Sequence, residues 1–501
     1  MGIMAGAGLR SADARIPPHN WDKYDFGPCP PITDRLNQGP FSAYGADATA
    51  PGAEVIMVTT PSKLVVPNYG MGLVTYICDE AGPPRVMNES LFDSIESLVK
   101  FPLGNKLYLR VDWRDIQQKQ GSLDFPDHWK ITFELARKYN KRVGIRIQLM
   151  SPDIEGHSVP GFLKDKIPFA ELGRTNEIGL PGKTHYAPRY DHPAFMSAFK
   201  ELDNLLSEAY NGSDLIEFVD TYLYGFWGEG HSWPFSGNPF PDYYTAEKTS
   251  IGLFEHQAKN WDKTPLLTNT QPDYSNVGNS EVLDRTIRTH NWLRTDTIFI
   301  ENEQIEALSN RPPWIGALVE NGISDGTPDS LRIFEGISRS ENIIYHAKDV
   351  SPNYFSLWNW HQISAESLKR YYLQFPDALD NLSVSIGYRI RPSWIWHYVK
   401  DGYPQIILGL VNDGISGVPG ALRVYLKNDQ GMTLSGGSLD PGFPLPGKVR
   451  QVELPLPRET DWRGLKLFAE LEVKSIRYPV KWACRELLNG DGSLSLRTNL
   501  K

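Results

Sequence analysis

Acidic and aromatic residues cluster in the segment Gly225-Phe226-Trp227-Gly228-Glu229-Gly230-His231. Glu229 stands between two glycines, which let the backbone approach a ligand closely. Trp227 and His231 flank it, and their rings would lower the local dielectric and raise the pKa of the carboxyl group. A carboxyl group kept protonated in this way can serve as a general acid. The alternative is a tight glycine turn that carries a solvated glutamate.

A second carboxyl group, Glu320, ends the apolar run Trp314-Ile315-Gly316-Ala317-Leu318-Val319. Cleavage of a glycosidic bond needs two carboxyl groups that flank the bond, one protonated and the other ionised as nucleophile or as base for water. Glu229 and Glu320 are the predicted pair, with Glu229 as the acid and Glu320 as the nucleophile. Glu301 and Glu303 are rival candidates for the second position, or ligands of sugar hydroxyl groups.

Other polar and aromatic residues stand where predicted strands end. Arg110 and Asp112 share one face of a strand because side chains alternate with a period of two. Arg110 would keep a neighbouring carboxylate ionised or fill the interior as an ion pair, and Asp112 would accept a hydrogen bond from a sugar hydroxyl. Trp358 and Trp360 would form a stacking floor. The remaining predicted substrate-binding residues are Gln148, Trp227, His231, Asn269 and His361.

These residues need a scaffold that brings strand ends together. From about Met71, short apolar runs alternate with amphipathic segments, which is typical of repeated βα units. Eight parallel strands with intervening helices close most simply into a barrel. The predicted fold class is therefore α/β, a (β/α)8 TIM barrel with its site at the carboxyl ends of the strands. The expected strands are Gly72–Cys78, Lys106–Trp113, Arg142–Met150, Ile216–Tyr224, Thr264–Thr268, Thr297–Ile300, Trp314–Glu320 and Tyr354–Trp360, with an irregular connection at Glu281–Trp292.

The regions on either side of this barrel differ from it. Residues 1–65 are rich in Pro and Gly and predict an irregular N-terminal arm, and the barrel is expected over residues 66–380. Residues 381–501 show period-two segments joined by Gly, Asn and Asp turns, which predicts a C-terminal antiparallel β-sandwich. Its expected strands are Gln405–Asn412, Ala421–Lys427, Val449–Leu454, Lys466–Val473 and Tyr478–Cys484.

The charge, the cysteine spacing and the lengths of the apolar stretches indicate which kinds of partner to expect. The 501-residue chain has a formal net charge of −9 and no basic block, so nucleic acid is not expected. The cysteines lack metal-ligand spacing, so no metal or other cofactor is expected. No apolar stretch reaches the roughly 18 residues that span a bilayer, so no membrane partner is expected. We expect a soluble protein, cytoplasmic or else secreted or periplasmic with its leader removed, whose partner is an oligosaccharide or polysaccharide. A homo-oligomer remains open.

The motifs resemble those of clan-A-type barrel glycoside hydrolases and, more narrowly, of β-galactosidase-like bacterial proteins that join a barrel to a C-terminal β-sandwich. They are Asn-Tyr-Gly-Met-Gly at 68–72, Gly-Phe-Trp-Gly-Glu-Gly-His at 225–231 and Leu-Val-Asn-Asp-Gly at 410–414. The resemblance implies that Glu229 is the acid/base and Glu320 the nucleophile of a retaining enzyme. Gly228 replaces the Asn that usually precedes the acid/base, so an inverting enzyme with another carboxylate is the nearest variant.

Two other classes of function remain. A non-catalytic carbohydrate-binding protein would keep the aromatic floor and lose the matched carboxylates. A polysaccharide lyase would need a Tyr or His base beside a group that neutralises a uronate. Candidates for those roles are Arg110, Arg146, Tyr222 and His231. For a hydrolase, the long insertions Ser151–His192 and Ser232–Tyr244 predict a walled pocket suited to chain ends, and therefore exo-acting cleavage.

Overall fold

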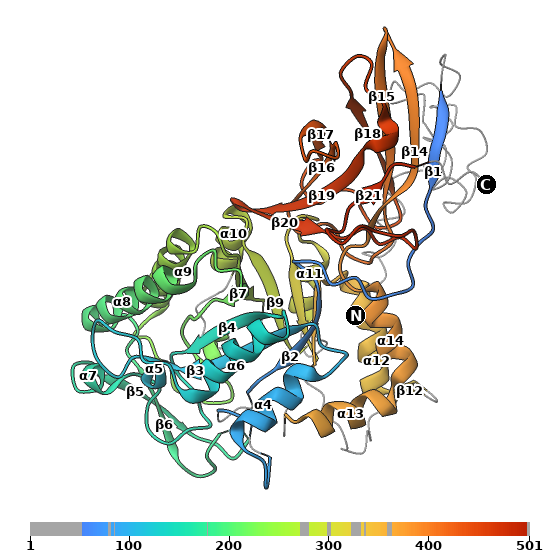
Figure 1. Ribbon diagram of the computed structural model, residues 1–501. Helices are drawn as coiled ribbons and strands as arrows, with labels where there is room; N and C mark the ends of the chain where they lie inside the picture. Colours follow the sequence, from blue (N-terminus) through green and yellow to red (C-terminus); the bar gives the residue numbers. More distant parts are fainter. Residues whose placement is uncertain are drawn as a thin grey trace, which may run out of the picture.

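The computed structural model describes residues 53–497 apart from 79–81, 85, 178, 271–279, 298–301, 322–331, 335–336 and 358–362. Its centre is a closed barrel of eight strands that follow one another in chain order, and all neighbouring pairs are parallel (Figure 1). The barrel strands are β2 (Gly72–Tyr76), β3 (Lys106–Asp112), β4 (Arg142–Gln148), β7 (Ile216–Asp220), β8 (Leu266–Asn269), β9 (Trp292–Thr297), β10 (Ala317–Glu320) and β13 (Tyr354–Ser356).

The barrel strands are buried on both faces. Every residue of β2, β3, β7, β8 and β10 is buried, because helices cover the outside and side chains fill the inside. Polar residues in these strands are therefore shielded from water and need partners inside the protein.

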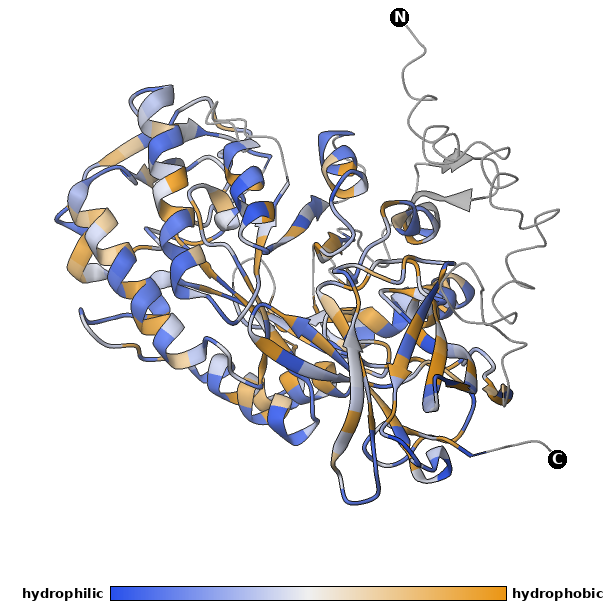
Figure 2. Ribbon diagram, turned by 90° about the horizontal axis from the view of Figure 1, so that it is seen from above, coloured by the Kyte–Doolittle hydropathy of each residue, from blue (hydrophilic) through white to orange (hydrophobic). Residues whose placement is uncertain are grey.

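Helices surround the barrel, and Figure 2 shows hydrophilic and hydrophobic residues alternating along them, as expected for helices with one buried face. The first of the described helices begins after Ser90, whose side chain caps it by accepting a hydrogen bond from the Asp93 backbone. The helices are α4 (Leu91–Lys100), α5 (Trp113–Ile116), α6 (Asp127–Lys138), α7 (Gly161–Lys164), α8 (Pro193–Tyr210), α9 (Tyr243–Asn260), α10 (Ser280–Arg288), α11 (Asn302–Ser309), α12 (Arg339–His346), α13 (Ala365–Gln374) and α14 (Pro376–Ser385).

The predicted limits of all eight barrel strands differ from the structure, and three of the strands differ most. The sixth strand is β9, so its predicted position at Thr297–Ile300 is wrong except for Thr297, and the connection expected to be irregular contains α10. The fourth strand ends at Asp220 and the eighth at Ser356, earlier than predicted. The sixth was missed because Arg294 and the three polar residues after it interrupt the apolar run that marks a buried strand.

Two antiparallel sheets follow the barrel and confirm the predicted fold class of a TIM barrel with a C-terminal β-sandwich (Figure 1). One sheet has the order β1-β14-β15-β18, and the other has the order β17-β16-β19-β20 with β21 beside β19. The strands are β1 (Glu54–Val58), β14 (Ile390–Lys400), β15 (Tyr403–Asn412), β16 (Ala421–Lys427), β17 (Thr433–Ser438), β18 (Val449–Pro455), β19 (Lys466–Val473), β20 (Ile476–Val480) and β21 (Leu494–Ser495).

Strand β1 comes from the segment expected to be an irregular arm. It pairs with β14, so this part of the N-terminal region lies beside the C-terminal sheet (Figure 1). Two hairpins lie outside both sheets, β5 (Phe169–Arg174) with β6 (Thr184–Pro188) and β11 (Arg332–Phe334) with β12 (Ile337–Ser338). Among the described helices, none has the length and apolarity needed to cross a bilayer.

Candidate active site

A buried cluster of charged side chains lies where the barrel strands end. Glu320 is the last residue of β10 and Asp220 the last of β7. Arg146 stands two residues before the end of β4, and Arg294 lies inside β9. Each of these side chains is almost fully buried, so their charges interact in a low-dielectric interior.

Glu229 reaches this cluster from the loop after β7. The loop turns through a short 3-10 helix, η2 (Phe226–Gly228), and the backbone of Trp227 is left-handed, with φ of 51°. Two interactions support this unfavourable conformation. The Trp227 backbone N–H donates to the Met150 carbonyl at 3.0 Å, and its indole N–H donates to the Asp153 carboxylate at 2.9 Å. Backbone strain held in place by its surroundings is typical of functional sites.

Asp220 is the common anchor of two arginines. Its Oδ2 accepts from Nε and Nη2 of Arg146 at 3.0 and 2.8 Å and from Nη1 of Arg294 at 2.7 Å. The Tyr108 hydroxyl donates to the same oxygen at 2.5 Å. Both guanidinium groups are therefore held in fixed positions relative to one another.

The same two arginines contact both predicted catalytic glutamates. Arg146 Nη1 lies 2.7 Å from Glu229 Oε1. Arg294 contacts Glu320 Oε2 through Nη2, while its Nη1 lies 4.0 Å from Glu229 Oε1. The Tyr76 hydroxyl donates to Glu320 Oε2 at 2.7 Å. Glu229 and Glu320 thus converge on a single guanidinium group, although 91 positions separate them in the sequence.

Glu229 and Glu320 have different pKa values because their electrostatic surroundings differ. Burial and the negative charge of Glu229 raise the pKa of Glu320 to about 7. Burial alone would raise the pKa of Glu229 too, but the neighbouring imidazole of His231 and the charges of Arg146 and Arg110 lower it to about 2. The pair therefore binds one proton up to about neutral pH. The predicted rise in the pKa of Glu229 is wrong, because arginines from other strands outweigh the aromatic surroundings.

The other predicted residues on β3 and β4 lie at the rim of this cluster. Asp112 and Gln148 are paired in register at the ends of the two strands, and both are buried. Burial and the charge of Asp115 raise the pKa of Asp112 to about 7. The Arg110 guanidinium lies over the Tyr76 ring, 5.7 Å from its centre, which places it beside the tyrosine that holds Glu320.

Three further predicted residues surround Glu229. His231 Nε2 lies 3.6 Å from Glu229 Oε2. The side-chain amide of Asn269 donates to the Glu229 carbonyl at 3.5 Å. The half-buried Trp227 ring lies near His231, with 5.9 Å between the ring centres.

Other predicted site residues are not brought to this cluster. Glu303, the predicted rival of Glu320, is exposed in the first turn of α11 and does not lie on a barrel strand. The Tyr222 hydroxyl donates to Asp203 of α8 in the surrounding helix layer, so Tyr222 is not a base at this site. Four predicted residues lie outside the described residues, namely Glu301, Trp358, Trp360 and His361.

Three members of the cluster were not predicted, namely Tyr76, Asp220 and Arg294. Arg146 was considered only for a lyase. The available signal was a charged residue inside an otherwise apolar strand, as in Phe218-Val219-Asp220, where burial requires a partner. This signal was not recognised for Arg294, because the sixth strand was predicted at Thr297–Ile300, after Arg294 in the sequence.

One group of described residues has the spacing of a cation site. Glu229, His231 and Asp296 each offer one ligand atom, and these atoms lie within 4.8 Å of one another. The Arg146 and Arg294 guanidinium groups, however, lie 2.7 and 4.0 Å from Glu229 Oε1. Two positive charges this close disfavour a further cation. The arrangement is better suited to hydrogen bonding and proton transfer.

No protein-family model and no curated protein matches this chain. The similar solved structures include the catalytic domain of a β-amylase from Paenibacillus polymyxa, with 11% identity, a TM-score of 0.40 and coverage of 60% of this chain and 97% of that one.

Two other solved structures are similar to a comparable degree. A β-galactosidase from Rahnella sp. R3 has 10% identity and a TM-score of 0.41, over 66% of this chain and 59% of that one. A glycoside hydrolase family 5 enzyme from Prevotella bryantii B14 has 12% identity and a TM-score of 0.36, over 65% and 99%. Similarities this weak carry no argument about function, and the strand pairing itself establishes the barrel.

Proposed function

We propose that this chain is a glycoside hydrolase that cleaves an O-glycosidic bond in an oligosaccharide or polysaccharide, with Glu229 and Glu320 as its catalytic pair. The observation that carries the proposal is the convergence of both carboxyl groups on Arg294 at the carboxyl ends of the barrel strands. Hydrolysis of an acetal by two carboxyl groups requires one of them protonated and the other ionised. A pair that holds a single proton up to about pH 7 meets that requirement.

We assign the nucleophile to Glu320 and the acid/base to Glu229. Arg294 and Tyr76 both donate to Oε2 of Glu320, which fixes that carboxylate and leaves Oε1 to attack the anomeric carbon. The two donors also stabilise the carboxylate when it leaves the glycosyl intermediate. The raised pKa belongs to Glu320, so this assignment requires the shared proton to pass to Glu229 when substrate binds.

Asp112, Gln148 and Asn269 lie at the rim, where we propose that they bind sugar hydroxyl groups. Carboxylate and amide groups accept and donate the hydrogen bonds that orient a sugar ring. The insertion after β4 contacts the loop that carries Glu229, because Asp153 accepts a hydrogen bond from the Trp227 indole, and this supports cleavage at chain ends. Retention of the anomeric configuration follows from the role proposed for Glu320.

The test is a screen of p-nitrophenyl glycosides in both anomeric series with the purified chain, followed by the Glu229→Gln variant on any substrate that is cleaved. We expect the variant to lose hydrolysis of natural oligosaccharides. With p-nitrophenyl glycosides, p-nitrophenol leaves without acid assistance, and azide should restore turnover by converting the glycosyl intermediate into a glycosyl azide, because azide attacks without needing a base. Full activity of Glu229→Gln on all substrates would refute the assignment. A product absorbing in the near ultraviolet from a uronic-acid polymer would indicate a lyase instead.

A further inference from the structure

The insertion that follows β4 encloses a cavity that the catalytic pair does not use. Its volume is about 180 Å³, and we call it the insertion pocket. Known sites for drug-sized ligands have about 300–1,000 Å³, so this pocket suits a single small ring. Six of its apolar wall residues are Leu149, Met150, Ile154, Val159, Leu180 and Pro188.

The insertion pocket shares a wall with the candidate active site. Met150 lines the pocket, and its carbonyl accepts the hydrogen bond of the Trp227 backbone two residues before Glu229. On the other side, the Ser158 carbonyl accepts from the backbone N–H of Arg114, two residues after the end of β3. A molecule in the pocket would therefore lie beside the ends of β3 and β4, next to the loop that carries Glu229.

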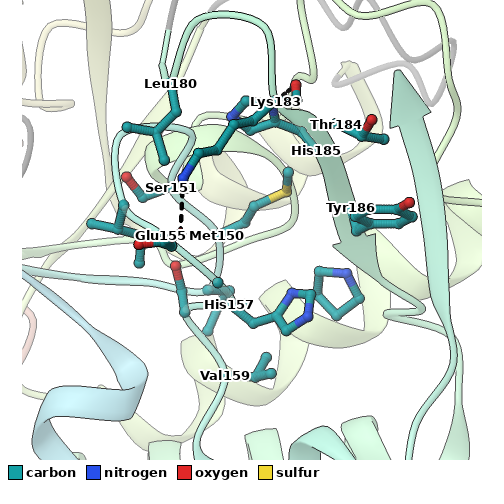
Figure 3. Close-up of a pocket in the computed structure, with 15 residues that line it drawn as sticks. Met150, Ser151, Glu155, His157, Val159, Leu180, Lys183, Thr184, His185 and Tyr186 are labelled. Carbon is teal, nitrogen blue, oxygen red and sulfur yellow. Dashed lines mark hydrogen bonds and ion pairs between the residues drawn. The ribbon is translucent and has the colours of Figure 1, made fainter. Parts of the chain in front are cut away.

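Polar and aromatic groups project into the insertion pocket. Figure 3 shows the Lys183 side chain reaching Glu155, with an Nζ–Oε1 distance of 2.8 Å, and the rings of His157 and Tyr186 around the cavity. Tyr186 is 42% exposed, so its ring is available for stacking. His185 Nε2 lies 3.0 Å from the Pro152 carbonyl, which joins the β5–β6 hairpin to the opposite wall.

The charges around the insertion pocket indicate an uncharged ligand. Its charged lining residues are Glu155 and Lys183, which neutralise one another. Burial, together with the charges of Lys164 and Arg114, lowers the pKa of His157, so that ring is neutral at neutral pH. A uronate or phosphate group would find no unpaired cation among these residues. Hydroxyl groups, in contrast, can hydrogen-bond to both members of the ion pair.

We propose that the insertion pocket is a second subsite that binds a neutral sugar unit of the same substrate, beyond the units held at Glu229 and Glu320. This inference rests on the proposed function. A second subsite raises affinity for longer chains, because each additional bound ring contributes binding energy. It also makes the chain length of the substrate, rather than its charge, the property that this region selects.

The experiment measures binding, so that it does not depend on hydrolysis. Neutral gluco-, galacto-, manno- and xylo-oligosaccharides of one to five units are titrated calorimetrically into the full chain carrying Glu229→Gln. We expect affinity to rise about ten-fold with chain length in this protein. Two further substitutions, Tyr186→Ala and Leu180→Trp, are each added to it, the second to fill the pocket. Each should abolish that rise. Tyr403→Ala is the matched control, because Tyr403 is 43% exposed on the sandwich. Thermal melting verifies that each variant folds.

The outcomes separate the two proposals. If affinity rises with chain length in Glu229→Gln and both pocket variants remove that rise, the subsite is supported. If the rise survives either folded pocket variant, or if affinity is independent of chain length, the subsite is refuted. Sugar binding that depends on the pocket in a chain without any hydrolytic activity would refute the proposed function and leave the subsite standing. A complete failure to bind sugars would refute both.

Discussion

Both ends of the barrel interior contain buried charged side chains, but the partners of the carboxyl groups differ between the two ends. At the amino ends of the strands, Glu217 of β7 accepts hydrogen bonds from Lys106 at 2.9 Å, the Tyr354 hydroxyl at 2.7 Å and the Gly70 backbone at 2.9 Å. Three residues further along the same strand, Asp220 belongs to the cluster at the carboxyl ends.

The difference lies in how many carboxyl groups share each site. At the amino ends, one carboxylate, Glu217, contacts the Lys106 ammonium group through Oε1. At the carboxyl ends, three carboxyl groups contact Arg146 and Arg294, and the charge of Arg110 acts on the same glutamates. The charge of Glu229 still raises the pKa of the buried Glu320, so the pair retains a proton, and a retained proton can be transferred. The comparison indicates that the amino end serves stability and the carboxyl end serves chemistry.

The largest expected effect is the loss of activity when a catalytic glutamate at the carboxyl ends of the barrel strands is replaced. Glu229→Gln or Glu320→Gln should lower kcat on unactivated substrates by about 10³-fold or more, since each removes a group that transfers a proton or attacks. Glu217→Gln is the matched change at the other end. It should leave kcat within about two-fold but lower the free energy of unfolding by about 3–5 kcal/mol, because Lys106 loses its buried partner. Kinetics and urea denaturation measure the two effects. Equal losses of kcat at both ends would contradict the comparison.

Arg294→Met should have the next largest effect. Without the guanidinium group, Glu320 loses a direct donor, and we expect kcat/KM to fall by about 10²-fold. Removing a cation raises the pKa of nearby carboxyl groups, so the alkaline limb of the pH profile should move to higher pH.

The control for this variant is Lys106→Met, which removes a buried cation at the amino end. It should lower the melting temperature without moving the alkaline limb. An unshifted limb in Arg294→Met would show that Arg294 does not act on the catalytic pair.

The pH profile of the unmodified protein sharpens the comparison further. Activity requires the singly protonated pair, which exists between a pKa of about 2 for Glu229 and about 7 for Glu320. Hence kcat/KM should be constant in weak acid and fall by about ten-fold per pH unit above about pH 7. Asp112 has a pKa of about 7 as well, so the measurement is repeated with Asp112→Asn. The alkaline limb should persist in that variant, and its loss would assign the limb to Asp112.

The smallest expected effect concerns the possible cation ligands Glu229, His231 and Asp296. Because Arg146 and Arg294 already supply positive charge there, dialysis against EDTA should change kcat by less than about two-fold. Activity that is lost on chelation and restored by a divalent cation would refute the claim that these three residues work without a bound cation.

The sequence predicted the features that depend on local patterns. The position of Glu320 at the end of a buried strand was predicted, because the apolar run before it is a signal that lies within a few residues. The alternation of short apolar runs with amphipathic segments was sufficient to predict the barrel.

Features that depend on distant partners were not predicted. Arg294 makes β9 polar, and that strand is stable only because Asp220 and Glu320 neutralise the guanidinium group. The same dependence reversed the pKa prediction for Glu229, whose neighbours in sequence are aromatic and whose neighbours in space include Arg146. Pairing across the barrel is set by strand register, which no short motif encodes.

The most direct test of the central claim is to trap the glycosyl intermediate. The chain is incubated with 2-deoxy-2-fluoro glycosyl fluorides that match its best substrate, and intact mass and peptide mapping locate the label. We predict one equivalent of label on Glu320 and no label in Glu320→Gln. Label on Glu229 would reverse the two roles, and rapid cleavage of natural substrate by Glu320→Gln would contradict the claim that this carboxyl pair breaks the glycosidic bond.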